Sequence, residues 1–479
     1  MCRSVLALGF IDNFVKKMEK VLTAKGKRKE VDMLHGPLLM RILMFALPLA
    51  ASSVLQQLFN SVDVAVVGRF ASSEALAAVG SNAPVISLLI NLFIGVSMGA
   101  NAVISNHIGQ NNNDGIKKSI STVALVSVIS GVFLLFLGLV VARPILTLMD
   151  TPAGVLDMAV DYLRIYFLGM PFFMIFNFGS AILRSVGDTK RPLYILIVAG
   201  IVNTILNLIF VIYFKMGVVG VAVATSVSNA VSAWLIIRIL LKEQEPYRLS
   251  LKHIRIEWPE LKRMLAIGVP AGVQGMVFSI SNVIVQSTIN GYGSDAVAGS
   301  AAALNFEFYC YFVVAAFNGA AISFIGQNYG AGKIDRVKRI FWLCMWMSVA
   351  SCAFLNILFA WQGNFFLDFF STEPEVHRFG LMRMYIVLTL QWIACSYEIA
   401  GSSLRGMGRS LSPTIYTIIG TCLLRIVWVF AVCPKWEGFD VLMMVYPISW
   451  TVTGVMVLCE YFTVVRMAEK KFAKADTHS

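Results

Sequence analysis

Long apolar runs separated by short polar loops are the feature that most constrains this chain. Most of the runs reach the roughly 20 residues that an α-helix needs to cross a bilayer. Lipid offers the backbone no hydrogen-bond partners, so a single segment can cross it only as a helix, which satisfies its own backbone hydrogen bonds. Hydrophobic residues make up 58% of the 479 residues and charged residues only 14%, which excludes a soluble protein. We therefore predict an all-α integral membrane protein with twelve transmembrane helices, at about 38–66, 76–108, 118–142, 156–182, 192–214, 217–241, 261–290, 296–325, 338–361, 378–403, 412–433 and 440–465.

The positions of lysine and arginine predict the orientation of the chain. These residues gather in the loops that follow even-numbered spans, and such loops are retained on the cytoplasmic side. We therefore expect both termini in the cytoplasm and a multi-pass protein of the plasma membrane. The basic residues that give the net charge of +12 are thus explained by membrane topology. We therefore expect a lipid bilayer around the protein and no nucleic-acid partner. The basic loop residues include Lys117, Lys118, Arg184, Lys190, Arg191, Arg238, Lys242, Lys333, Arg336, Arg405 and Arg409.

An internal repeat divides the chain into two halves. Three short patterns recur at offsets of 217 to 222 residues, which indicates a tandem duplication. Each half holds six spans, an even number, so both halves enter the bilayer in the same direction. We therefore predict two six-helix lobes related by a pseudo-two-fold axis along the membrane normal. The patterns are Pro48…Asn60 with Pro270…Asn282, Ile108-Gly-Gln-Asn111 with Ile325-Gly-Gln-Asn328, and Leu183-Arg-x-x-Gly187 with Leu404-Arg-x-x-Gly408.

The predicted domain organisation follows from the spans and the repeat. We expect a basic cytoplasmic N-terminal tail over 1–36, an N-lobe over 37–241, a hydrophilic cytoplasmic linker over 242–260, a C-lobe over 261–466 and a cytoplasmic C-terminal tail over 467–479.

Asp63 is the leading candidate for a functional side chain, because an ionisable group inside a span is costly and is a functional hypothesis by default. With Gln56 and Asn60 it forms a polar stripe at helical spacing, and Pro48 earlier in the same span would hinge the helix. The alternative is that Asp63 lies at the interface and pairs with Arg69.

Other intramembrane polar residues leave two interpretations open. Asn203 and Asn207 are four residues apart on the fifth span, and they could complete a site with Asp63 or join helices to one another. Glu398 corresponds to Asn177 in the repeat, and either could serve transport or hydrogen-bond a neighbouring helix. Gln274 and Asn282 form a polar line on the seventh span. For Glu307 and Arg425 a charge pair or an interfacial position is favoured over a functional role.

Taken together, these residues resemble the multidrug and toxic compound extrusion (MATE) family over about 33–466. The resemblance rests on Pro48…Asn60-Ser-Val-Asp63 with Gly68, on Glu74-Ala-Leu-Ala-Ala-Val-Gly80, on the two Gly-Gln-Asn turns and on the paired Leu-Arg-x-x-Gly motifs. It implies two six-helix lobes that export organic cations, drugs or other amphiphiles by alternating access in exchange for protons or sodium ions.

The resemblance also implies roles for particular residues. Pro48 matches the first-helix hinge, Asp63 the acid of the coupling site and Asn203 an asparagine of that site. Asn207 stands where several members carry an aspartate, so the coupling ion, a proton or a sodium ion held by Asp63, Asn203 and Asn207 with help from Asn60, is left open. Further substrate or coupling residues would be Gln56, Asn177, Gln274, Asn282 and Glu398.

The sequence leaves one alternative function open and predicts few partners. A flippase for lipid-linked saccharides, from a related family with the same duplicated bundle, is the nearest alternative, although it would need more cationic residues in its cleft. An enzyme is not expected, because no DDxxD or HExxH pattern is present. We expect a monomer with a small amphiphilic or cationic substrate and no cofactor besides the coupling ion.

Overall fold

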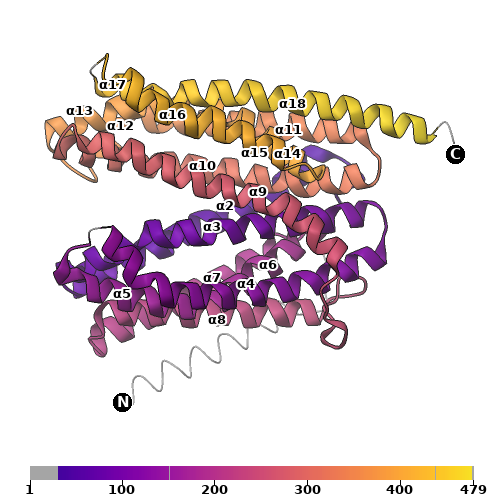
Figure 1. The fold of residues 1–479 in the computed structure, drawn as a ribbon, viewed down its shortest axis with the longest axis horizontal. Helices are drawn as coiled ribbons and strands as arrows, with labels where there is room; N and C mark the ends of the chain where they lie inside the picture. The colour runs from indigo at the N-terminus through magenta and orange to yellow at the C-terminus, as the bar shows by residue number, and fades with distance from the viewer. Residues whose placement is uncertain (1–30, 150, 437, 477–479) are drawn as a thin grey trace. The chain divides into compact units, whose positions relative to one another are not determined.

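The structure, a computed structural model, describes residues 31–149, 151–436 and 438–476, and all the regular structure in these ranges is helical (Figure 1). The prediction of a basic tail over 1–36 falls mostly outside these ranges. The first half of the chain forms α2 (Leu38–Phe70), α3 (Ser73–Gly109), α4 (Asn113–Leu148), α5 (Ala153–Leu168), α6 (Met170–Val186), α7 (Lys190–Leu208), η1 (Ile209–Tyr213) and α8 (Gly217–Leu241).

The second half repeats this series with more interruptions. It comprises η2 (Leu251–His253), α9 (Trp258–Asn290), α10 (Ser294–Gly330), α11 (Ile334–Trp361), α12 (Gly363–Leu367), α13 (Pro374–Arg383), η3 (Met384–Leu388), η4 (Gln391–Ala394), α14 (Cys395–Gly406), α15 (Leu411–Thr417), η5 (Ile418–Leu423), α16 (Leu424–Val427), η6 (Trp428–Val432), α17 (Phe439–Met443) and α18 (Val445–Asp476).

The prediction of twelve spans is confirmed. Within the described residues, eleven helices or runs of helices are long and apolar enough to cross a membrane, and α5 with α6 makes the twelfth as one bent span. The bend of 46° falls at Gly169, just before Pro171. A proline has no N–H to donate, and its ring clashes with the carbonyl four residues earlier, so a straight helix is disfavoured there. Helix α18 continues to Asp476, so most of the predicted C-terminal tail is helical.

The paired Leu-Arg-x-x-Gly motifs form the same structure in both halves. Gly187 ends α6 with a φ of 99°, and Gly408 follows α14 with a φ of 83°. In each case the glycine N–H donates to the arginine carbonyl, and the next N–H donates to the leucine carbonyl, at 2.8 to 3.0 Å. Only glycine adopts this left-handed conformation without strain. The sequence repeat is therefore also a repeat of local structure.

Backbone contacts divide the described chain into two compact units. The first unit contains Val31, Ala51–Ile104 and Asn112–Met264, and the second contains Asp32–Ala50, Ser105–Asn111 and the chain from Leu265 onward. Helix α2 therefore begins in the second unit and continues in the first, and it runs without a break through Pro48.

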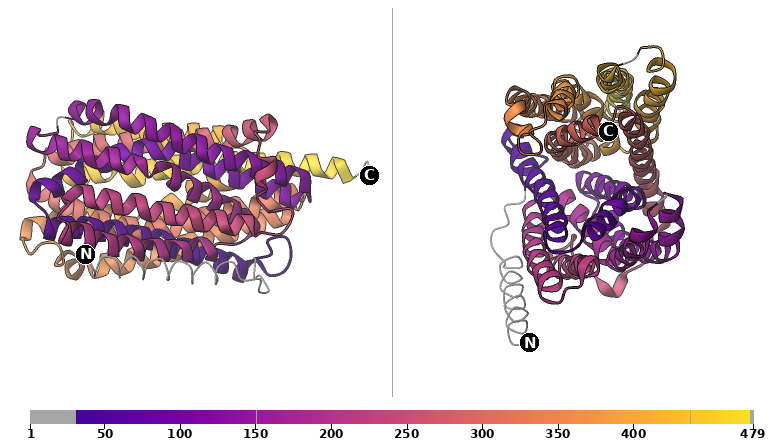
Figure 2. Two further views of the ribbon diagram at one scale, coloured as in Figure 1. Left: turned by 90° about the horizontal axis from the view of Figure 1, so that it is seen from below. Right: turned by 90° about the vertical axis from the view of Figure 1, so that its left-hand side faces the viewer.

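Each unit is a bundle of helices, as the end-on view in Figure 2 shows. In the first unit α8 contacts α5, α6 and α7, and α4 contacts α5 and α6 (Figure 1). In the second unit α10 contacts α11, α13 and α14, and α18 contacts α14 and α15. The segment predicted as a linker lies against α4 of the first unit, where the Ser121 hydroxyl accepts from the Arg255 N–H at 2.7 Å and Thr122 accepts from the Glu257 N–H at 3.1 Å.

Candidate functional site

Asp63 is a buried acid in the C-terminal third of α2, with 9% of its surface exposed. A charged group in the middle of a membrane costs roughly 3 kcal/mol or more. No lysine, arginine or histidine forms an ion pair with it in the described part of the chain, and Arg69, the partner considered from the sequence, is exposed. The carboxylate is therefore not neutralised by a cationic side chain.

Four polar side chains from three helices close into a hydrogen-bonded ring around this acid. Asn207 on α7 donates to one Asp63 oxygen at 2.5 Å and to the Asn203 Oδ1 at 3.1 Å. Asn203 donates to the Thr225 hydroxyl on α8 at 3.3 Å, and that hydroxyl donates to the second Asp63 oxygen at 3.4 Å. The structure thus brings Asp63, Asn203 and Asn207 together, as the sequence predicts for one coupling site.

One acceptor of this ring has no partner. The Oδ1 atom of Asn207 is buried and accepts no hydrogen bond in the described residues. An unsatisfied buried carbonyl is unfavourable, so the ring offers an oxygen lone pair beside an unneutralised carboxylate. The Tyr162 and Tyr166 side chains of α5 also interact electrostatically with Asp63, which makes α5 the fourth helix of the site.

A close crossing of α2 and α7 brings the ring members together. Phe59, one turn before Asp63, lies over Gly200, nearly one turn before Asn203. A Cβ at position 200 would stand 1.8 Å from the Phe59 ring, so no larger residue fits without moving one helix. Glycine at 200 is therefore what lets the acid on α2 reach the amides on α7.

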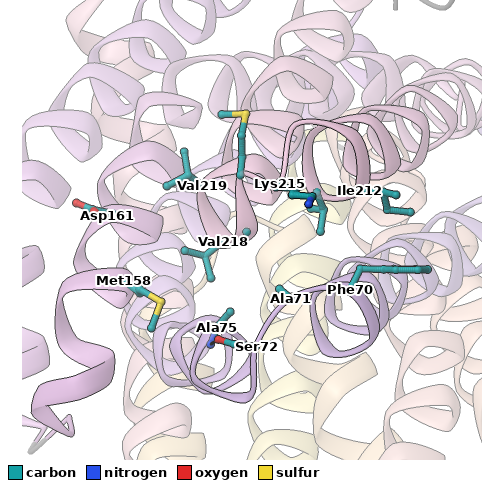
Figure 3. A pocket seen from close by; sticks show the side chains of 13 residues that line it. Phe70, Ala71, Ser72, Ala75, Met158, Asp161, Ile212, Lys215, Val218 and Val219 are labelled. Atoms are coloured by element: carbon teal, nitrogen blue, oxygen red, sulfur yellow. Dashed lines mark hydrogen bonds between the residues drawn. The ribbon is translucent and has the colours of Figure 1, made fainter. Parts of the chain in front are cut away.

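A cavity of about 540 Å³ lies beyond the ring, at the C-terminal end of α2 (Figure 3). Phe70 of α2, Val211 of η1, Val218 of α8 and Asp161 of α5 all line it. Because η1 continues α7 in one span, the same four spans form the cavity and the site. At 1.5 Å per residue, these residues are about 2 to 10 Å along their helices from the ring or its tyrosines. Asp161 and Lys215 stand at separate points of its wall (Figure 3).

Chemically, the ring supplies a carboxylate, two amide oxygens and a hydroxyl. Hard cations prefer oxygen ligands of this kind, and a carboxylate also takes a proton. Loading by either would remove a buried negative charge. The arrangement is suited to binding one small cation reversibly.

Comparison with known proteins identifies the family to which this arrangement belongs. The MatE family model matches residues 48–209 and 270–430, once in each half of the repeat and over more than half of the chain. The chain belongs to the MATE family. Its members are transporters, so the chain is a multi-pass membrane transporter.

Individual relatives support this assignment. The chain is 29% identical over 382 residues to the Probable multidrug resistance protein YoeA of Bacillus subtilis, covering 78% of this chain and 82% of the relative. It is 26% identical over 434 residues to a FAD transporter of Shewanella oneidensis, covering 88% and 93%. A crystal structure of a MATE transporter in the bent conformation matches with a TM-score of 0.87 at 20% identity, covering 94% of this chain and all of that one, and it shows that the folds agree.

Several residues predicted for the MATE coupling site lie outside the ring. Asn60 and Gln56 are exposed on α2, and their side chains make no hydrogen bond within the described residues. Asn177 donates to the Phe173 carbonyl of its own helix at 3.0 Å. The roles of these three residues, like the hinge at Pro48, stay predictions.

The second unit holds its own buried polar group around Glu398. Asn318 donates to this carboxylate at 2.7 Å, and Arg405 interacts with it electrostatically. Arg405 also donates to Gln274 at 2.6 Å, which accepts from Thr414 as well at 3.4 Å. Glu398 and Gln274 are thus close to one arginine, and the acid has a partner that Asp63 lacks.

Of the two residues for which a charge pair was considered, Glu307 forms one and Arg425 does not within the described residues. Glu307 accepts two hydrogen bonds from Arg383 at 2.6 and 3.0 Å, and it lies on α10 where α13 packs. Arg425 donates to Asn282 at 3.0 Å. Both arginines are buried.

Sequence reasoning missed Thr225, Tyr162 and Tyr166. Thr225 stands in a span with three serines, and no spacing rule selects it from them. The tyrosines are four residues apart on one face of α5, which is a signal, but aromatic pairs at this spacing are usually packing residues.

Proposed function

We propose that this MATE transporter is a secondary active antiporter that exports amphiphilic small molecules in exchange for protons or sodium ions by alternating access. The observation that carries the proposal is the closed ring around Asp63. A structural acid in a membrane protein is expected to have a cationic partner, and the described chain supplies none. A mobile cation is then the natural partner.

Loading of the ring changes the contacts of α2. In the unloaded state Asn207 and Thr225 donate to Asp63. A proton or sodium ion competes for the same carboxylate oxygens, so at least one of these bonds must change when the ion arrives. The helix that carries Asp63 then repacks, and Pro48 on the same helix supplies a hinge, since its missing N–H leaves one helical hydrogen bond unmade.

Coupling follows if ion and substrate stabilise different states of the protein. The free energy of ion binding then drives the change that releases substrate, and the linkage is reciprocal. The cavity at the C-terminal end of α2 serves as the port for the ion, because it lies on the four helices that form the site and contains the exposed carboxylate of Asp161.

The setting is the plasma membrane, with both termini in the cytoplasm and one chain as the functional unit. The relatives are named as multidrug resistance proteins and as a FAD transporter, which supports amphiphilic small molecules of either charge sign as the substrate class.

Asp63→Asn tests the proposal, because it keeps the size of the side chain and removes its charge. In proteoliposomes with imposed proton or sodium gradients, we expect gradient-driven transport of a cationic dye, ethidium, and an anionic dye, fluorescein, to fall to the level of empty liposomes. Asp157→Asn is the matched control, since Asp157 is an exposed acid of the same unit. Gradient-driven transport of either dye by Asp63→Asn at the wild-type rate would remove Asp63 from the mechanism.

A further inference from the structure

Arg425 is a fully buried cation in α16 with an unusual set of partners. Its Nη1 donates to Asn282 on α9 at 3.0 Å, and its Nε donates to the Ser449 hydroxyl on α18 at 3.4 Å. Its guanidinium carbon lies 4.5 Å from the ring centroid of Tyr446 and 5.3 Å from that of Phe278. Aromatic faces attract a cation, but none of these groups carries a negative charge.

Comparison with the other buried arginines of the second unit shows what is missing. Arg383 lies against the same Tyr446 ring, but it is neutralised by Glu307. Arg405 interacts with Glu398. Arg425 has no acidic partner in the described chain, and a guanidinium does not deprotonate in proteins. Its charge is therefore uncompensated in an apolar setting, where it is strongly unfavourable.

The internal repeat places this arginine on the span that corresponds to α7, which carries two residues of the Asp63 ring. The offset of 221 that relates Leu183 to Leu404 relates Asn203, a member of the Asp63 ring, to Leu424, so Arg425 lies one position beyond the counterpart of Asn203. In the repeat α9 corresponds to α2, and α18 to α8. The hydrogen bonds of Arg425 to Asn282 and Ser449 thus join, in the second unit, the helices that correspond to those of the ring. The charged residue of this group is an arginine, whereas that of the ring is an aspartate.

We infer that Arg425 and Asn282 form a binding site for an oxyanion, a carboxylate or a phosphate, carried by an aromatic amphiphile. A planar guanidinium matches these oxyanions with parallel hydrogen bonds, and the rings of Tyr446 and Phe278 offer an apolar wall. Asn282 is exposed, and its Nδ2 donates to no described residue, so it is the accessible side of the site. The inference rests on the proposed export function, because it names which substrates are selected.

Equilibrium binding of fluorescein, an anionic aromatic dye, tests the inference. Fluorescence anisotropy would be measured with the purified protein in phosphatidylcholine nanodiscs, with ethidium as the cationic comparison. Truncation of one partner of a buried charge pair weakens binding strongly, so Arg425→Gln should raise the fluorescein Kd by about tenfold or more. Ethidium binding should not weaken. Arg409→Gln, at an exposed arginine of the same unit, should leave both values unchanged.

Asn282→Asp supplies a second test that does not remove the buried charge. A carboxylate at this position, 3.0 Å from Nη1, would act as a built-in counter-ion and compete with the ligand. We expect a similar loss of fluorescein binding and a higher Tm. If Arg425→Gln does not fold, this variant decides alone.

Three results would overturn the inference: no fluorescein binding by the wild-type protein, unchanged binding in both variants, or loss of wild-type binding when phosphatidylglycerol replaces phosphatidylcholine. The last would assign the site to a lipid headgroup. Asp63→Asn separates the two proposals, because it should abolish gradient-driven transport while leaving equilibrium binding of fluorescein intact.

Discussion

At the scale of single residues, Asn207 is the member of the ring whose chemistry can change most. Its amide nitrogen donates to both Asp63 and Asn203, whereas its buried oxygen accepts no hydrogen bond from the described residues. An aspartate at this position would remove both donations and add a second charge within hydrogen-bonding distance of the first. Two adjacent carboxylates hold cations more strongly than one.

Asn207→Asp should therefore change which ion drives transport, or its affinity. With proton and sodium gradients imposed separately in proteoliposomes, we expect a lower half-saturating concentration of the driving ion, by roughly tenfold for a gain of about 1.4 kcal/mol. Asn305→Asp on α10 is the matched control, since the Asn305 side chain bonds only a carbonyl of its own helix. Identical ion dependence in Asn207→Asp and wild type would place Asn207 outside the coupling site.

Single residues also show what a sequence can reveal of such a site. Asp63 is conspicuous because charge is rare in apolar spans, and Asn203 and Asn207 share a face by helical spacing alone. Helical spacing does not say which faces of distant helices meet. For that reason it could not select Thr225, and it placed Asn60 with the coupling residues although Asn60 is exposed and bonds no member of the ring.

At the scale of helices, the crossing of α2 over α7 sets the geometry of the ring. Phe59 rests on Gly200, within about one turn of both Asp63 and Asn203. The sequence identifies the two helices and their polar faces, but it gives no hint that this glycine is a contact point, because glycines are common in membrane helices.

Gly200→Ala should push α2 away from α7. The added Cβ would overlap the Phe59 ring, and overpacking of this kind costs about 1 to 3 kcal/mol. We expect a lower Tm in detergent and a loss of gradient-driven transport larger than the loss of folded protein. Gly80→Ala on α3, where a Cβ meets nothing within 4 Å, is the control. Wild-type transport by Gly200→Ala would show that the ring tolerates displacement of α2.

At the scale of the whole molecule, the sequence predicted the span number, the duplication and the family, because each depends on a pattern summed over many residues. The sequence did not predict where the helices depart locally from α-helical geometry. The π-helical segments η1, η3, η5 and η6 leave no mark in hydropathy, since a π-turn changes hydrogen bonding without changing composition.

Sidedness can be tested at the cavity shown in Figure 3. In a cysteine-free background, Asp161→Cys should react with a membrane-impermeant cationic methanethiosulfonate from outside the cell, and the label should block transport. Asp157→Cys, one turn away on α5 and outside the cavity, should react without loss of transport. Reaction of Asp161→Cys only in inverted vesicles would reverse the predicted topology, and labelling without inhibition would exclude the cavity as the ion's port.

Helix α2 changes unit between Ala50 and Ala51, two residues after Pro48. The chain also changes unit inside α3, between Ile104 and Ser105, and inside α9, between Met264 and Leu265. Of these three helical passages, only the one in α2 follows directly on a proline, where the backbone lacks a stabilising bond and yields most easily to torsion. Helix α2 therefore passes from one unit to the other close to the residue where its backbone has one hydrogen-bond donor fewer, and the same helix carries Asp63 fifteen residues later.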